Sequence, residues 1–86
     1  MFLEIVTPEE KVFEGEVVSA TFPGSDGCFQ LLNNHAAIVS VLGRGDIKYQ
    51  EEKQKEVHML VEGGVVEVTH NRVNVLVEKF YKEDEN

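Results

Sequence analysis

Short alternations of apolar and polar residues run through the sequence, and this pattern restricts the fold more than any other feature. Leu3 and Ile5 share one side of a first segment, with Glu4 between them, and Val73 and Val75 share one side of a last segment. A spacing of two residues places such side chains on one face of a β-strand. Fourteen of the 86 residues are valine, whose branched side chain favours strands over helices. The pattern predicts an all-β chain.

Turn-forming residues divide these segments at short intervals. Expected turns, rich in glycine, proline or asparagine, lie at residues 7–10, 23–27, 33–34, 43–45, 63–64 and 70–71. The highly charged segment 51–56 is expected to form the tip of a hairpin. Residues 7–13 resemble the start of a short helix, but Val12 and Phe13 favour a strand. Many short strands with regular turns predict an antiparallel sandwich or barrel.

Composition excludes several classes of protein. A length of 86 residues fits one domain, and 16 acidic against 8 basic residues give a formal net charge of −8. That charge argues against nucleic acid and anionic lipid as direct partners. No apolar run approaches the roughly 20 residues of a membrane span. The single cysteine, Cys28, excludes an internal disulfide.

One thin hydrophobic core is expected between the strands. The core candidates are the apolar residues at alternating positions: Val18, Phe22, Val39, Val41, Leu60, Val65, Val73 and Val75.

The residues that could carry catalysis or bind a metal do not form a convincing set. Cys28 and His35, with Asp26 to orient the histidine, are the first candidates for nucleophilic catalysis. A reactive thiolate needs positive surroundings, which this acidic chain lacks. The histidines His35, His58 and His70 have no metal-ligand spacing. We therefore expect no catalytic residue, no metal and no cofactor.

A carrier domain is the main alternative. Small acidic β-domains that bear lipoate or biotin place one lysine on an exposed hairpin, and Lys53 lies in the expected tip 51–56. A solvated, charged tip is the ordinary interpretation of the same residues, since charge protects a hairpin against edge pairing.

Residues 23–37, PGSDGCFQLLNNHAA, resemble the core motif of the epsilon subunit of the bacterial F-type ATP synthase. Further segments resemble that family in the same order along the chain: residues 3–8, 12–17, 45–49, 63–68 and 71–76. The resemblance covers nearly all of residues 2–78.

The resemblance implies a sandwich of two antiparallel sheets with about ten short strands. We expect residues 1–80 to form this domain and the polar, acidic residues 81–86 to form a C-terminal tail. It also implies a non-catalytic subunit at the foot of the rotating central stalk, between the gamma subunit and the polar loops of the membrane c-ring. Such a subunit couples the two during proton- or sodium-driven ATP synthesis, peripherally at the cytoplasmic face of the bacterial plasma membrane.

The resemblance also implies contact residues for the c-ring. They lie in two expected turn regions: Ser25, Asp26, Gly27, Cys28, Asn33, Asn34, His35 and Ala36. The chain departs from the family at Cys28, where glutamate is common, and at Asn33 and Asn34, where proline and glycine are common.

A second departure from the family is at the C-terminal end. Many relatives continue into a helical hairpin that inhibits ATP hydrolysis and in some binds ATP. This sequence ends at Asn86, so we expect a naturally short form, with a shortened piece of a longer chain as the alternative. In either case the resemblance implies no ATP binding by this sequence.

Overall fold

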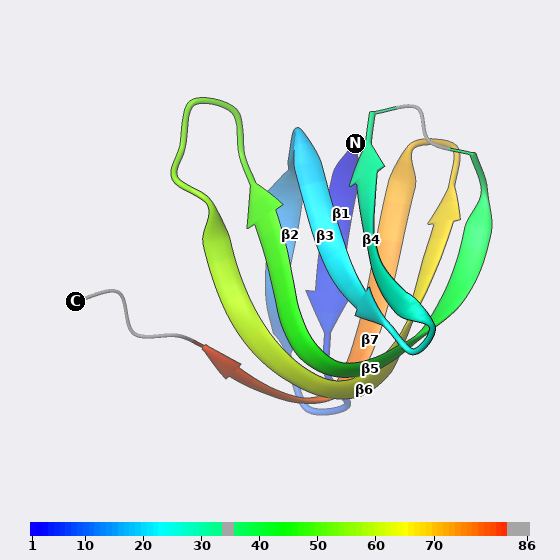
Figure 1. The fold of residues 1–86 in the computed structure, drawn as a ribbon. Helices are drawn as coiled ribbons and strands as arrows, with labels where there is room; N and C mark the ends of the chain where they lie inside the picture. Colours follow the sequence, from blue (N-terminus) through cyan, green and yellow to red (C-terminus); the bar gives the residue numbers. More distant parts are fainter. Residues whose placement is uncertain (34–35, 83–86) are drawn as a thin grey trace.

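Seven β-strands form the fold in the computed structural model, which describes residues 1–33 and 36–82 (Figure 1). The strands are β1 (Phe2–Val6), β2 (Lys11–Glu16), β3 (Ser19–Gly24), β4 (Gly27–Leu32), β5 (Ile38–Gln50), β6 (Val57–Thr69) and β7 (Arg72–Lys82). No helix occurs among the described residues. The all-β prediction is confirmed, including the strand over Val12 and Phe13. Strand β7 continues two residues past the expected end of the domain at residue 80.

The strands form one sheet in the order β2-β1-β7-β6-β5-β3-β4. Strands β1 and β7 are parallel, and the other neighbouring pairs are antiparallel. Figure 1 shows that β5, β6 and β7 curve sharply, so the sheet folds over on itself in two layers. One layer holds β1 and β2, and the other holds β3 and β4. The expected sandwich is confirmed, with the difference that its two layers belong to one folded sheet in which β1 and β7 are parallel. Its four short strands and the halves of its three long ones account for the ten expected segments.

Glycines mark the corner where the long strands bend. Residues 43–45 and 63–64 were expected as turns, but they lie inside the continuous strands β5 and β6. Gly63 has φ 72° and Gly64 has φ 154°, values that residues with a Cβ rarely adopt. A Cβ on Gly64 would lie 2.4 Å from the carbonyl oxygen of Leu76. The glycines thus bend the strands without ending them.

The expected turns at residues 23–27, 51–56 and 70–71 are found near their predicted places, whereas the turn expected at residues 33–34 lies partly outside the described residues. The tip 51–56 joins β5 to β6, and the β3–β4 turn is formed by Ser25 and Asp26. Strands β6 and β7 are joined through His70 and Asn71, with φ 49° and 62°. Positive φ at both central residues is the requirement of the type I′ hairpin turn, whose twist matches that of the flanking strands.

The hydrophobic core lies between the two layers. Phe22, Val73 and Val75 are buried as expected, and Leu60 is partly buried. Four of the expected core residues are exposed instead: Val18 (39%), Val39 (70%), Val41 (58%) and Val65 (42%). The prediction failed at these positions because both faces of the strands carry apolar residues, so alternation alone does not show which face is inside. The buried neighbours of the exposed valines are Val17, Leu42 and Val66.

Candidate interaction face

Four apolar side chains from four neighbouring strands form a continuous row on the outside of the molecule. Val41 of β5 pairs with Val65 of β6, Val65 pairs with Leu76 of β7, and Leu76 pairs with Val6 of β1. We call these four residues the outer apolar row. Val41, Val65 and Leu76 are 58%, 42% and 50% exposed, and Val6 is half-buried. On a domain of 86 residues, a contiguous exposed apolar strip is typical of surfaces that contact another molecule.

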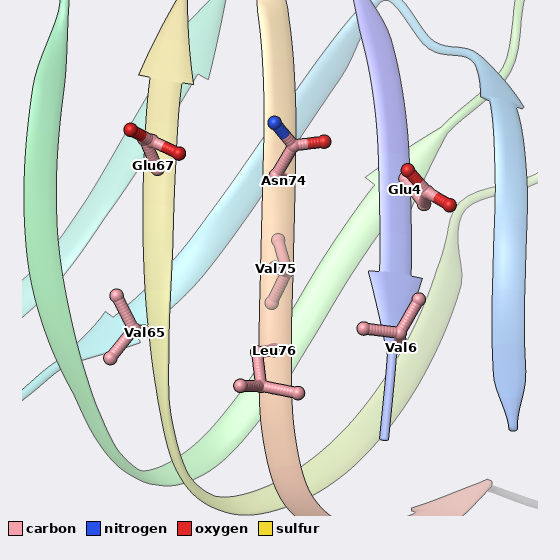
Figure 2. Close-up of a pocket in the computed structure, with 7 residues that line it drawn as sticks. All are labelled: Glu4, Val6, Val65, Glu67, Asn74, Val75 and Leu76. Carbon is pink, nitrogen blue, oxygen red and sulfur yellow. The ribbon is translucent and has the colours of Figure 1, made fainter. Parts of the chain in front are cut away.

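A polar row lies beside the outer apolar row, one outward position further along the same strands. Glu67 of β6 pairs with Asn74 of β7, and Asn74 pairs with Glu4 of β1 (Figure 2). The polar row and three members of the outer apolar row, Val6, Val65 and Leu76, line a hollow of about 550 Å³ on this face. Val39, which is 70% exposed, pairs with Glu67 and extends the apolar surface on β5. The face is thus an apolar strip with a narrow polar border.

The two carboxylates of the polar row differ in their partners. The carboxylate of Glu4 lies 3.4 Å from Lys11 Nζ and 3.2 Å from Arg72 Nη2. Lys11 also donates a hydrogen bond of 2.9 Å to Glu14, and its carboxylate neighbours, Glu14 before Glu4, raise the pKa of the Lys11 ammonium. Glu67 has no ion pair or hydrogen bond with any side chain in the described part of the chain. Among the described residues, Glu4 therefore has cationic partners and Glu67 has none.

The expected c-ring contacts lie at opposite ends of β4 (Figure 1). Ser25, Asp26, Gly27 and Cys28 lie in and beside the β3–β4 hairpin turn, where the Cys28 thiol is exposed. The Ser25 amide donates to the Val41 carbonyl at 2.9 Å, so this hairpin is attached to the strand that carries the outer apolar row. The second group follows the other end of β4, and its members Asn34 and His35 lie outside the described residues.

Asn33 takes part in a contact within the molecule. The α-ammonium of Met1 donates to Asn33 Oδ1 and, at 3.1 Å, to the carbonyl oxygen of Val17. The same ammonium lies 3.4 Å from the carboxylate of Glu16. Asn33 and Ala36 are exposed, but the amide oxygen of Asn33 serves to anchor this loop to the start of the chain.

The residues considered for catalysis, metal binding or carrier function lie in different parts of the fold. His58 bonds Glu56 at 2.9 Å beside the β5–β6 tip, and His70 lies in the β6–β7 turn. No group of three metal-ligating side chains occurs within residues 1–33 and 36–82. Lys53 occupies the exposed tip 51–56, as expected, with φ 61°.

The described part of the chain also has no helix that is both long and apolar enough to cross a membrane.

Sequence reasoning missed the outer apolar row. The row depends on the pairing of four strands. Two of them, β1 and β7, are neighbours in the sheet although they lie at opposite ends of the chain. The available signal was the run Val65, Val66, Glu67, Val68, in which an apolar residue stands on each face. Such a run is typical of a strand with both faces in contact with other groups, but it does not identify those groups.

Residues 1–83 match the family model described as the ATP synthase delta/epsilon chain, beta-sandwich domain. The ATP synthase epsilon chain of Nitratiruptor is 42% identical over 88% of this chain and 59% of its own length. That of Chlorobium limicola is 38% identical over 88% of this chain and 86% of its own length. The chain thus spans well under two thirds of the length of some curated relatives and most of another.

The fold also occurs in a solved assembly. A chain in the cryo-EM structure of the central stalk and c-ring of the Tetrahymena thermophila mitochondrial ATP synthase superposes with a TM-score of 0.79. The match covers 94% of this chain and 65% of that chain, at 23% sequence identity. At this level of identity the likeness establishes the shared sandwich fold.

Proposed function

Because the chain belongs to the ATP synthase delta/epsilon family, whose beta-sandwich domain it matches over residues 1–83, we propose that it is a non-catalytic rotor subunit. In this proposal it couples the gamma subunit to the membrane c-ring of an F-type synthase during ion-driven ATP synthesis. The observation that carries the proposal is the outer apolar row, an exposed strip across four strands. The chain provides a rigid body and two contact zones, which are the outer apolar row and the β3–β4 hairpin.

The chemistry of each zone suits a different partner. The outer apolar row is broad and apolar, as in an interface that stays closed throughout the working cycle, and we assign it to the gamma subunit. The β3–β4 hairpin is small and polar, with Asp26 at its turn, and it suits the polar loops of the c-ring. The ring contacts we propose are Ser25, Asp26, Gly27 and Cys28, with Asn33, Asn34, His35 and Ala36 as a second group.

The fold is suited to transmitting force between these zones. Strands β5, β6 and β7 pass through both layers, so backbone and ladder hydrogen bonds connect the layers directly. The bond from Ser25 to the Val41 carbonyl ties the hairpin to β5. A close-packed core has low compressibility. A load applied at the hairpin is therefore passed to the outer face with little deformation.

The family match favours this function over a lipoyl or biotinyl carrier with Lys53 as its modified residue. Intact mass spectrometry of the native chain distinguishes the two, because a carrier would show the mass increment of its prosthetic group. We expect the unmodified mass.

A charge placed in the outer apolar row tests the assignment of gamma. Leu76→Asp is the test and Leu32→Asp, on β4, is the matched control, since the two leucines are 50% and 53% exposed. We expect Leu76→Asp to weaken binding to a gamma-containing catalytic head, stripped of this chain, by more than about tenfold, because a carboxylate would be buried without a partner. Leu32→Asp should bind normally. Equal binding by Leu76→Asp and the unmodified chain would contradict the assignment.

A further inference from the structure

Glu67 is a carboxylate at the edge of an apolar surface, and no cation of residues 1–33 or 36–82 pairs with it. It stands two residues from Val65 on β6, which separates the two Cα atoms by about 7 Å. Its cross-strand neighbours on the same face are Val39 and Asn74. In Figure 2 its side chain lies beside the hollow, above Val65. The carboxylate therefore borders apolar side chains and one amide, and none of these supplies a positive charge.

A partner seated on the outer apolar row must also cover Glu67. A stable interface buries about 800 Å² on each side, whereas the whole domain measures 31 × 29 × 24 Å. A footprint centred on Val65 and Leu76 therefore extends over the polar row. Removing an unpaired carboxylate from water is unfavourable by several kcal/mol, so a partner that covers Glu67 needs a group that compensates its charge.

Glu4, the other carboxylate on this face, has cationic partners within the chain. Lys11 and Arg72 both contact its oxygens, so Glu4 needs no cation from outside. Glu67 has both oxygens available, and the described residues place no lysine or arginine against it. An arginine side chain can bond both oxygens of a carboxylate at once.

We propose that Glu67 forms an ion pair with an arginine or lysine of the gamma subunit at the edge of the outer apolar row. This inference rests on the proposed function and adds a residue that determines which partner is accepted. Apolar contact supplies most of the affinity, and the charge pair fixes the orientation of the partner. A partner surface with an acidic or purely apolar group opposite Glu67 is rejected by repulsion or by the cost of desolvation.

Charge variants of Glu67 test the proposal in a binding assay with the gamma-containing head. Glu67→Gln keeps the shape and removes the charge, and Glu67→Lys reverses it. The matched control is Glu52→Lys, because Glu52 is exposed in the tip 51–56 and forms no ion pair with the other described residues. We expect about tenfold weaker binding for Glu67→Gln, a larger loss for Glu67→Lys and no change for Glu52→Lys. The salt dependence of binding should also fall in Glu67→Gln.

The outcomes separate this inference from the proposed function. If both Glu67 variants bind like the unmodified chain while Leu76→Asp fails to bind, the ion pair is wrong and the gamma-binding face stands. If Leu76→Asp binds normally as well, both are wrong. Equal losses for Glu67→Lys and Glu52→Lys would show a general effect of net charge and would overturn the ion pair. Melting curves of all variants check that the fold is intact.

Discussion

Tyr49 joins the core to the base of the hairpin tip. Its side chain is 5% exposed, and its ring centroid lies 4.2 Å from that of Phe13. Burial, and secondarily the charge of Glu51, raise the pKa of the Tyr49 phenol above 10.0. Both effects disfavour the phenolate, so the folded state favours the neutral ring.

This pKa shift makes stability depend on pH in the alkaline range. In the unfolded chain the phenol loses its proton near pH 10.0, while the folded chain still holds it. The contribution of Tyr49 is thus fully present below that pH and is lost as the pH rises through the raised pKa. We expect Tyr49→Phe to lose less stability than the unmodified chain between about pH 9 and pH 11. Thermal melts across this range measure the difference, and parallel curves would contradict it.

Single residues also show the limit of prediction from the sequence. Val65 and Val66 are adjacent and chemically identical, yet the first is 42% exposed and the second is fully buried. Val66 faces the opposite layer of the folded sheet and Val65 does not. The alternation of apolar and polar residues cannot show which face of a strand is covered in this way. Likewise, nothing in the sequence indicates that Asn33 accepts a hydrogen bond from the α-ammonium of Met1, because the contact joins distant segments.

At the scale of elements, the sequence was sufficient for strands and for tight turns. The pair His70 and Asn71 and the charged tip 51–56 were recognisable because local chemistry sets their conformation. The glycine segments 43–45 and 63–64 were misread as turns, since glycine serves equally in a turn and in a bend inside a strand. Only the pairing of β5 with β6 through this corner distinguishes them.

The bend predicts unequal effects of two glycine substitutions. A Cβ on Gly64 would lie 2.4 Å from the Leu76 carbonyl oxygen, whereas the nearest atom to a Cβ on Gly43 is 3.8 Å away. We expect Gly64→Ala to destabilise the fold by about 3 kcal/mol, or roughly 15 °C in melting temperature. The control Gly43→Ala should change stability by less than about 1 kcal/mol. Calorimetry measures both, and similar melting temperatures would contradict the role of Gly64.

At the scale of the whole molecule, one folded sheet presents two different surfaces. The outer apolar row faces away from the core on the layer that contains β1, and the β3–β4 hairpin projects from the other layer (Figure 1). The β3–β4 turn could be predicted from the sequence because its residues are local, and its expected contact role came from the resemblance to the epsilon family. The outer apolar row could not be recognised from the sequence, because it depends on the pairing of β1 with β7.

The central claim, that this chain is clamped between two partners, is most directly tested by hydroxyl-radical footprinting of side chains. The oxidation of each residue is compared by mass spectrometry between the free chain and the assembled synthase. We expect strong protection of Val41, Val65 and Leu76 and separate protection of Cys28. If the outer apolar row is oxidised as readily in the assembly as in the free chain, the account is contradicted.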